Sequence, residues 1–228
     1  MPLEQNQNQK RTGRIVGFVL IKLIAILLFS LLAAIGYLIL RSHDPLYVIR
    51  ELKNWTDYRR FDPLIVKTSR EYNIDPRLIK AVVWRESRFQ SDMLGRHGER
   101  GLMQVTEVAA RDWAAAKSIP DFQPDQLLQP EMNLKIGIWY LNKAVQRWTT
   151  RDDALPFALA EYNAGKTRVD RWIRQAGEKT SGQPVTAQRF TDSIEFPSTA
   201  RYVRSIIARY DFYRRRGPLR VSDGDEPR

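Results

Sequence analysis

The sequence predicts a mainly α-helical protein with a single N-terminal membrane-spanning helix. Three observations predict this fold class. Residues 15–40 form an apolar run that only Lys22 interrupts, residues 61–213 carry helical hydrophobic spacing without long alternating runs of the β type, and none of the 228 residues is cysteine. The lack of cysteine excludes a disulfide framework, a thiolate zinc site, an iron–sulfur cluster and a cysteine nucleophile.

Five segments follow one another in this prediction. We expect a disordered tail over 1–14, a transmembrane helix over 15–40, a juxtamembrane linker over 41–61, a globular domain over 62–213 and a flexible tail over 214–228. About 20 apolar residues are enough to span a bilayer. A cleaved signal peptide is the alternative, but its apolar core is usually about 7–15 residues long and is followed by a small-x-small cleavage site. The apolar run is longer and lacks a clear site of this kind, so the membrane anchor is favoured.

Basic residues exceed acidic ones by 37 to 26, which gives a formal net charge of +11, and residues 41–228 keep 33 basic against 25 acidic residues. Such an excess favours anionic partners such as a membrane surface, nucleic acid or an acidic polymer. The basic residues are spread along the chain and interleaved with acids, so we expect no nucleic-acid partner. The flanking charges, four at the start of the apolar run and five after it, do not set its orientation.

The helix predicted over 76–89 places a carboxylate on an apolar face. Asp75 is a natural N-cap and Pro76 suits the first helical position. The apolar stripe of this helix consists of Ile79, Val82 and Val83. The next position of the stripe, near the end of the helix, is Glu86, where burial would raise the pKa and favour a general acid. The alternative interpretation is a structural ion pair with a neighbouring arginine.

The rest of the domain reads as further helices joined by turns. They are expected from the end of the GLMQV segment (101–105) to about 116, over 131–148, from Asp152 or Asp153 to just before Gly165, from Thr167, and from Ser198 after a loop over 177–197. Gly101 suits a turn that needs a positive φ. Gly137 lies within the predicted helix 131–148, where glycine costs about 1 kcal/mol of helix stability relative to alanine. We therefore expect another element to pack tightly against this position.

Four short motifs occur in order along the domain. They are ES at Glu86–Ser87, GLMQ at Gly101–Gln104, MNLKIGIWYL at 132–141 and EYNAG at 161–165. Each motif alone is weak, but together and at these spacings they resemble the lytic transglycosylase domain of the soluble-lytic-transglycosylase (SLT) type, which is related in fold to goose-type lysozyme. The resemblance covers roughly residues 62–213. It implies a mainly α, lysozyme-like domain that cleaves the β-1,4 bond between N-acetylmuramic acid and N-acetylglucosamine in peptidoglycan, without water, to leave a 1,6-anhydromuramoyl end.

The resemblance also assigns roles to single residues. Glu86 matches the one catalytic residue, which acts first as general acid and then as general base. The positions that match the saccharide groove are Ser87, Met103, Gln104, Tyr162 and Asn163. Tyr202 matches a tyrosine that in the family points towards the catalytic carboxylate. No cofactor or metal is implied. The partner is peptidoglycan, which lies outside the cytoplasmic membrane, so we expect residues 41–228 on the periplasmic side of a single-pass inner-membrane protein.

Several positions depart from the family pattern. Glu99 stands where the family usually has alanine, and Glu161 stands where it has a small apolar residue. Glu195 follows Ile194, and Ser198 and Thr199 precede Tyr202 and Val203 where the family has other residues. Glu99 or Glu161 could act as a base for water, which would make the protein a muramidase-type hydrolase, although surface charge balanced by arginines is the favoured interpretation. A non-catalytic glycan-binding scaffold is the second alternative.

Overall fold

A computed structural model describes residues 17, 19–37, 57–178 and 184–219 of the chain. It divides into two compact units, Met1–Trp55 and Thr56–Arg228. The expectations for residues 1–14, 41–56 and 220–228 lie outside the described residues.

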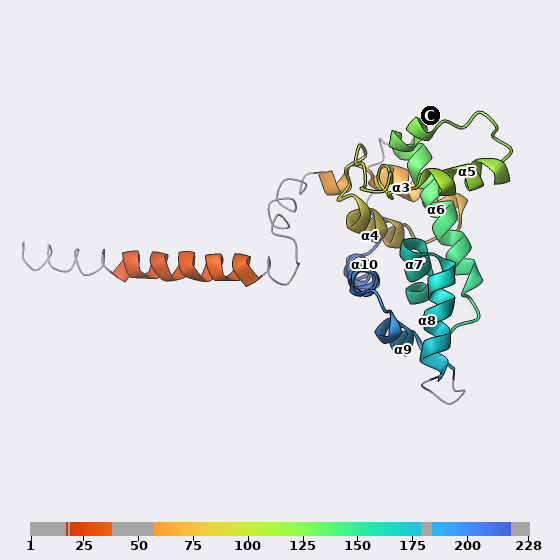
Figure 1. The fold of residues 1–228 in the computed structure, drawn as a ribbon. Helices are drawn as coiled ribbons and strands as arrows, with labels where there is room; N and C mark the ends of the chain where they lie inside the picture. The colour runs from red at the N-terminus through yellow and green to blue at the C-terminus, as the bar shows by residue number, and fades with distance from the viewer. Residues whose placement is uncertain (1–16, 18, 38–56, 179–183, 220–228) are drawn as a thin grey trace, which may run out of the picture. The chain divides into compact units, whose positions relative to one another are not determined.

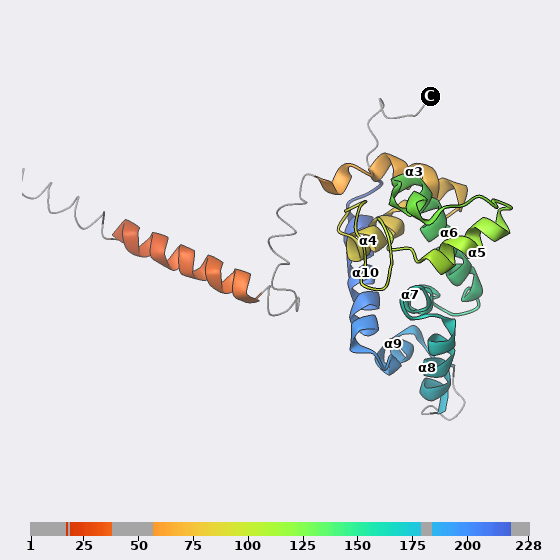
Figure 2. The ribbon, with the colours of Figure 1, turned by 45° about the horizontal axis from the view of Figure 1, so that its top comes forward.

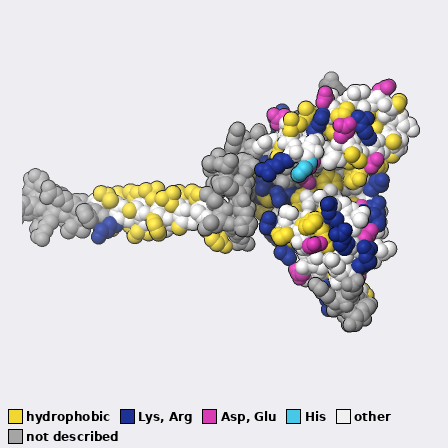
Figure 3. Space-filling model, in the orientation of Figure 1, with side chains coloured by type: hydrophobic (Ala, Val, Ile, Leu, Met, Phe, Trp, Pro, Cys, Tyr) yellow, Lys and Arg dark blue, Asp and Glu magenta, His cyan; other side chains and the backbone are white. Residues whose placement is uncertain are grey.

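The first unit contains one apolar helix, Val19–Tyr37. It is 19 residues long, has a mean hydropathy of 2.7 and has no part buried against other described residues. Figure 3 shows hydrophobic side chains along most of the visible face of this helix. The helix is therefore long and apolar enough to cross a membrane, a property that a signal sequence near an N-terminus shares.

The second unit is helical, as the sequence predicts (Figure 1). Its elements are η1 (Asp57–Arg59), α3 (Asp62–Glu71), α4 (Pro76–Glu86), α5 (Glu107–Ala116), η2 (Pro124–Leu128), α6 (Pro130–Arg147), α7 (Leu155–Ala164), α8 (Lys166–Glu178), α9 (Ala187–Ser193) and α10 (Pro197–Arg215). Within the described ranges the only β-type pairings are two isolated bridges, which join Arg100 to Leu94 and to Val105.

Local signals in the sequence fix the start of α4. The Asp75 side chain accepts a hydrogen bond from the backbone N–H of Arg77 at 2.9 Å, and Pro76 occupies the first helical position. The helix ends at Glu86, three residues before the predicted end, and Ser87 is its C-cap. Its interior positions are buried, so α4 is a core helix that carries a carboxylate at its last turn.

Gly137 of α6 allows the loop before α5 to pack against the middle of that helix. A Cβ atom at this position would lie 2.6 Å from Sδ and 2.8 Å from Cβ of Met103. Met103 is fully buried. The tight packing that the sequence predicts at Gly137 is thus the contact with this loop. Gly101, at the start of the same loop, has the expected positive φ of +75°.

The segment 177–197, predicted as a loop, contains the short helix α9. Thr186 caps it by accepting a hydrogen bond from the N–H of Arg189 at 3.4 Å. Phe190 of α9 is fully buried and stacks on Phe157 of α7, with ring centroids 4.2 Å apart. Seven residues carry too little periodicity to predict a helix from the sequence. Contacts with α7, α8 and α10 hold α9 in place, among them this ring contact and the hydrogen bond from the Ser193 hydroxyl to the carbonyl oxygen of Trp172 in α8.

Helix α10 connects the elements that form the site. It packs along α4 and against α7, and α7 in turn packs on α6 (Figures 1 and 2). The ends of α4, α7 and α10 and the loop 94–105 are therefore close together, although they are far apart in the sequence.

Candidate active site

Glu86 lies at the contact between α4 and α10. Its Oε1 atom accepts a hydrogen bond of 2.6 Å from the hydroxyl of Tyr202, a residue that is 116 positions later in the sequence. Tyr202 is only 3% exposed, whereas Glu86 is partly exposed. The carboxyl group is therefore held by a buried phenol while the residue keeps some access to solvent.

The electrostatics of this position favour the protonated carboxyl group. Burial raises the pKa of Glu86 from 4.5 to about 7, against the opposing effects of the Tyr202 hydrogen bond and of the positive charge on Arg85. The negative charge of Glu99 adds to the increase. Glu86 is also the last residue of its helix, and the partial negative charge of a helix C-terminus disfavours a carboxylate. Glu86 can therefore both carry and release a proton near neutral pH.

Tyr162 of α7 lies on the same site. Its hydroxyl donates a hydrogen bond to the carbonyl oxygen of Met103 at 2.9 Å, and its ring meets that of Tyr140 edge to face. Burial raises the pKa of Tyr162 well above 10, and the nearby charge of Glu86 is the second cause. The phenol is therefore neutral at physiological pH and can only act as a hydrogen-bonding group.

Gln104 and Asn163 are held by elements that also contribute Met103, Tyr162 and Tyr202. Gln104 has a positive φ of 48°, and its Nε2 donates to the carbonyl oxygens of Gly101 at 3.0 Å and Met93 at 3.2 Å. Asn163 is exposed, and its Oδ1 accepts a hydrogen bond of 2.8 Å from the hydroxyl of Thr199. Both amides are held in place by the protein, and each keeps polar atoms available for a ligand.

Two of the predicted groove residues lie inside the protein instead. Ser87 is 1% exposed, and its hydroxyl donates to the carbonyl oxygen of Leu102 at 2.8 Å. Met103 has no exposed surface and packs against Gly137. Neither side chain is therefore exposed to line a groove. Both residues are buried by tertiary contacts, because elements distant in the sequence pack over them, and the local sequence does not indicate these contacts.

Asn133 is a structural residue of the site that sequence reasoning missed. It is fully buried in α6, and its Oδ1 accepts a hydrogen bond of 2.8 Å from the N–H of Met103. Its Nδ2 donates to the carbonyl oxygens of Arg100 at 2.7 Å and Leu127 at 2.8 Å. An asparagine one turn before Gly137, on the same face of a core helix, is the sequence signal that could have identified it.

The two additional carboxylates have different environments. Glu161 is 8% exposed, pairs with Arg147 and accepts a hydrogen bond of 2.8 Å from Nε1 of Trp148. The pairing of Glu161 with an arginine agrees with the interpretation that the sequence favoured. The side chain lies in the interior and not on the surface, however, and its oxygens are occupied by these partners. Glu99 lies near Glu86, because its negative charge raises the pKa of Glu86. Hydrogen bonds from backbone N–H groups, one of them that of His97 at 2.9 Å, hold the pKa of Glu99 below 4.5 although burial opposes this.

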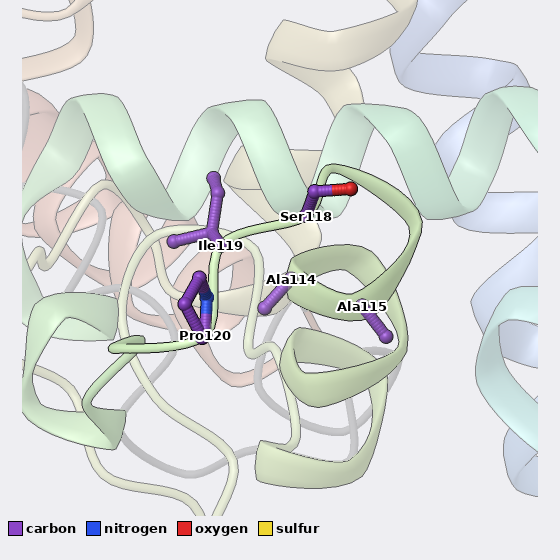
Figure 4. Close-up of a pocket in the computed structure, with 5 residues that line it drawn as sticks. All are labelled: Ala114, Ala115, Ser118, Ile119 and Pro120. Atoms are coloured by element: carbon purple, nitrogen blue, oxygen red, sulfur yellow. The ribbon is translucent and has the colours of Figure 1, made fainter.

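Other features contribute no chemistry to the site. A shallow pocket of about 380 Å³ at the end of α5 is lined by Ala114, Ala115, Ser118, Ile119 and Pro120 (Figure 4). These side chains offer no acid or base, and none of them belongs to the group around Glu86. Among the described residues, no three His, Asp or Glu side chains gather in a metal-binding group.

The chain is similar in sequence to known proteins. The family model described as the transglycosylase SLT domain matches residues 63–183. The soluble lytic murein transglycosylase of Salmonella typhimurium is 33% identical over 156 residues, which cover 68% of this chain and 23% of that protein. The membrane-bound lytic murein transglycosylase F of Desulfosudis oleivorans is 35% identical over 118 residues, which cover 50% of this chain and 24% of that protein.

A solved structure shows the same fold. The 70 kDa soluble lytic transglycosylase from Escherichia coli matches with a TM-score of 0.59 and 30% identity, over 68% of this chain and 24% of the other. This match confirms the predicted fold class, a mainly helical, lysozyme-like domain. The chain spans about a quarter of the length of these relatives.

Proposed function

Because the chain belongs to the transglycosylase SLT domain family, we propose that it is a peptidoglycan lytic transglycosylase. It cleaves the β-1,4 bond between N-acetylmuramic acid and N-acetylglucosamine and leaves a 1,6-anhydromuramoyl end. The observation that carries the proposal is the state of Glu86, a carboxyl group with a pKa of about 7 that is held by Tyr202 at 2.6 Å. General acid catalysis is most effective when the pKa of the acid lies near the working pH.

One carboxyl group is sufficient for this reaction. Protonated Glu86 gives its proton to the glycosidic oxygen, and the bond from that oxygen to the anomeric carbon breaks. The N-acetyl oxygen of the muramic acid stabilises the positive anomeric centre. Glu86, now a carboxylate, takes the proton of the sugar's 6-hydroxyl, whose oxygen bonds to the anomeric carbon. Most glycosidases use a second enzyme carboxylate as nucleophile or base. Here the N-acetyl and 6-hydroxyl groups of the substrate take the place of that second carboxylate.

The surrounding residues position the saccharide. We expect Gln104, Tyr162 and Asn163 to contact the saccharide, because each is fixed by a hydrogen bond to the protein and the charge of Glu86 acts on Tyr162. Tyr202 stabilises the carboxylate that forms after the first proton transfer, since its hydroxyl donates to Oε1. Pre-organised donors of this kind stabilise charge that develops during a reaction.

Digestion of purified peptidoglycan in ¹⁸O-labelled water tests the proposal. We expect muropeptides with anhydro ends that contain no ¹⁸O, because the attacking oxygen belongs to the sugar. Products with reducing ends that carry ¹⁸O would instead assign the protein as a muramidase-type hydrolase, with Glu99 as the residue to examine as base for water. Binding without cleavage would assign a non-catalytic glycan-binding scaffold.

We further propose that Val19–Tyr37 anchors the protein in the cytoplasmic membrane, with the domain on the periplasmic side, where peptidoglycan lies. The length and hydropathy of the helix support an anchor, and its position near the N-terminus is also that of a signal sequence. Membranes from expressing cells, extracted with alkaline carbonate, separate the two. An anchored protein stays in the membrane and begins at its original N-terminal sequence, whereas a processed protein is released and lacks the helix.

A further inference from the structure

The side chains around Glu86 use their hydrogen-bond donors within the protein. The hydroxyl of Tyr162 donates to the carbonyl oxygen of Met103 at 2.9 Å, and the hydroxyl of Tyr202 donates to Glu86 at 2.6 Å. The amide nitrogen of Gln104 donates to two backbone carbonyl oxygens, at 3.0 Å and 3.2 Å. A neutral phenol has one hydrogen to donate and an amide nitrogen has two. The oxygens of Tyr162 and Gln104 are therefore left as acceptors, which select a ligand group that donates.

Glu99 places a carboxylate next to the side-chain oxygen of Gln104. A Cβ atom on Gly95 would collide with Oε2 of Glu99 and would lie 2.8 Å from Oε1 of Gln104, so both oxygens lie over the Cα atom of this glycine. Gly95 is not one of the glycines with a positive φ, so its backbone does not require glycine. The space left by the missing side chain is what lets the carboxylate and the amide oxygen come together.

The negative charge of Glu99 is only weakly balanced by the protein. Among the described residues it pairs with His97, whose Nδ1 lies 3.4 Å from Oε1, and with no lysine or arginine. The His97 side chain is 86% exposed, and a histidine is cationic only when it is protonated. The Glu99 side chain itself is only 26% exposed, and backbone N–H groups hold its pKa below 4.5. A largely buried carboxylate that stays ionised favours a cation supplied by the ligand.

The loop that carries Glu99 and Gln104 lies against the end of α4. Ser87, which directly follows Glu86, donates its hydroxyl to the carbonyl oxygen of Leu102 in this loop at 2.8 Å. The negative charge of Glu99 raises the pKa of Glu86, so the two carboxyl groups interact through space. The paired acceptors of the loop are therefore close to the group that acts on the glycosidic bond.

We propose that the Glu99 carboxylate and the Gln104 amide oxygen form a subsite for an ammonium group of the cell-wall polymer. The proposal deepens the lytic transglycosylase function proposed above and rests on it. An ammonium group has three donors and a positive charge, so it can bond both oxygens and neutralise the carboxylate. An N-acetyl group offers one donor and no charge. The ammonium group belongs either to a glucosamine residue without its acetyl group or to a diamino acid of the peptide stem. Glu99 determines specificity and takes no part in the proton transfers.

The test measures kcat/KM of the full chain on pairs of substrates that differ only in amine acetylation. The first pair consists of stem-free glycan strands whose glucosamine residues are either N-acetylated or enzymatically de-N-acetylated, while the muramic acid keeps its N-acetyl group. The second pair consists of fully N-acetylated strands with intact peptide stems, before and after acetylation of the stem amines. At about pH 6 these amines are protonated. We expect the parent protein to prefer the ammonium form at least about tenfold in one pair, which identifies the source of the group. No preference in either pair would overturn the proposal.

Glu99→Gln separates specificity from a general effect on catalysis. The variant keeps the size of the side chain and an acceptor for the N–H of His97 but removes the charge, so the preference should fall below about twofold. The altered charge also acts on Glu86, but this effect is the same for both substrates of a pair and cancels in their ratio. Gly95→Ala displaces the Glu99 carboxylate without removing its charge, and we expect it to lower the preference as well.

Asp125→Asn provides the matched control. Asp125 is 92% exposed and pairs at 2.7 Å with Arg100, the residue that follows Glu99. The variant removes one negative charge beside the same loop and should keep the preference of the parent. An equal loss of preference in Asp125→Asn and Glu99→Gln would overturn the proposal, because it would assign the effect to the net charge of the loop. A preference that Glu99→Gln retains would overturn it as well.

Failure of the proposed function gives a separate result. Products with ordinary reducing ends from every substrate contradict the transglycosylase reaction, and the ratio of kcat/KM within each pair still tests the subsite. If no substrate is cleaved, the dissociation constants of the same pairs replace kcat/KM. Tighter binding of the ammonium form that Glu99→Gln abolishes would then support the subsite, and equal binding within both pairs would overturn it.

Discussion

Replacement of Tyr202 by phenylalanine should raise the pKa of Glu86. The Tyr202 hydroxyl donates to Oε1 of Glu86 at 2.6 Å, and this hydrogen bond favours the ionised carboxylate. A hydrogen bond to a charged group contributes about 1.5–3 kcal/mol, and one pKa unit corresponds to about 1.4 kcal/mol. Because water can partly replace the hydroxyl at a partly exposed carboxyl, we expect an increase of about one unit above the value of about 7.

The pH dependence of kcat/KM measures this change. Cleavage requires the protonated acid, so kcat/KM falls as the pH rises through the pKa of Glu86 in the free enzyme. In Tyr202→Phe this descending limb should move to higher pH by about one unit. The maximum of kcat/KM should also be lower, because the Glu86 carboxylate that forms on proton transfer loses its hydrogen-bond donor.

A second tyrosine on the same helix provides the control. Tyr210 donates its hydroxyl to Asp75 at 2.9 Å, so Tyr210→Phe removes a comparable hydrogen bond without touching Glu86 and should leave the limb in place. A limb that stays where it is in Tyr202→Phe, or that moves to lower pH, would refute the assignment of Glu86 as the titrating acid.

Three further predictions concern stability. The pKa of Glu86 is about 7 in the folded protein and ordinarily 4.5, so the folded state binds more protons than the unfolded state between these pH values, and the stability of the protein falls as the pH rises through them. Glu86→Gln should remove this pH dependence. In urea unfolding the variant should be up to about 3 kcal/mol more stable than the parent at pH 8 and no more stable at pH 4. Gly137→Ala should be destabilising by about 1–2 kcal/mol, because the new Cβ meets Met103 at 2.6–2.8 Å and overpacking exceeds the gain in helix propensity; a midpoint at or above that of the parent would contradict the packing. Asn133→Leu removes three hydrogen bonds, those to the N–H of Met103 and to the carbonyl oxygens of Leu127 and Arg100, and only the Arg100 carbonyl keeps another partner, the N–H of Val105; we expect a loss of about 3 kcal/mol, and a loss below about 1 kcal/mol would show that the Asn133 hydrogen bonds are unimportant for stability.

Local signals were sufficient to predict part of the architecture. Asp75 and Pro76 define the start of α4 within a few residues, and the stripe that leads to Glu86 follows from helical spacing alone. The positive φ of Gly101 and the close packing at Gly137 were predictable for a similar reason. In each case only one residue type fits the backbone or the space at that position.

Contacts between distant segments were not predictable from these signals. The short helix α9 depends on Phe190 stacking on Phe157, and the burial of Ser87 and Met103 depends on elements that pack over them. The contact between Glu86 and Tyr202 spans 116 residues, and only the resemblance to a known family indicated it. Glu161 shows the same limit, because pairing with an arginine was expected, but neither the partner, Arg147, nor the interior position of Glu161 was.

The most direct test of the central claim is the digestion of purified peptidoglycan by the Glu86→Gln variant. Glutamine has nearly the same shape as glutamate but cannot exchange a proton with the substrate. A positioned acid–base group contributes at least about 100-fold to the rate. We predict that anhydro-ended muropeptides form at less than about one hundredth of the parent rate, while urea unfolding shows a cooperative, folded domain. Release of these products at a rate near that of the parent would contradict the assignment of Glu86 as both the acid and the base.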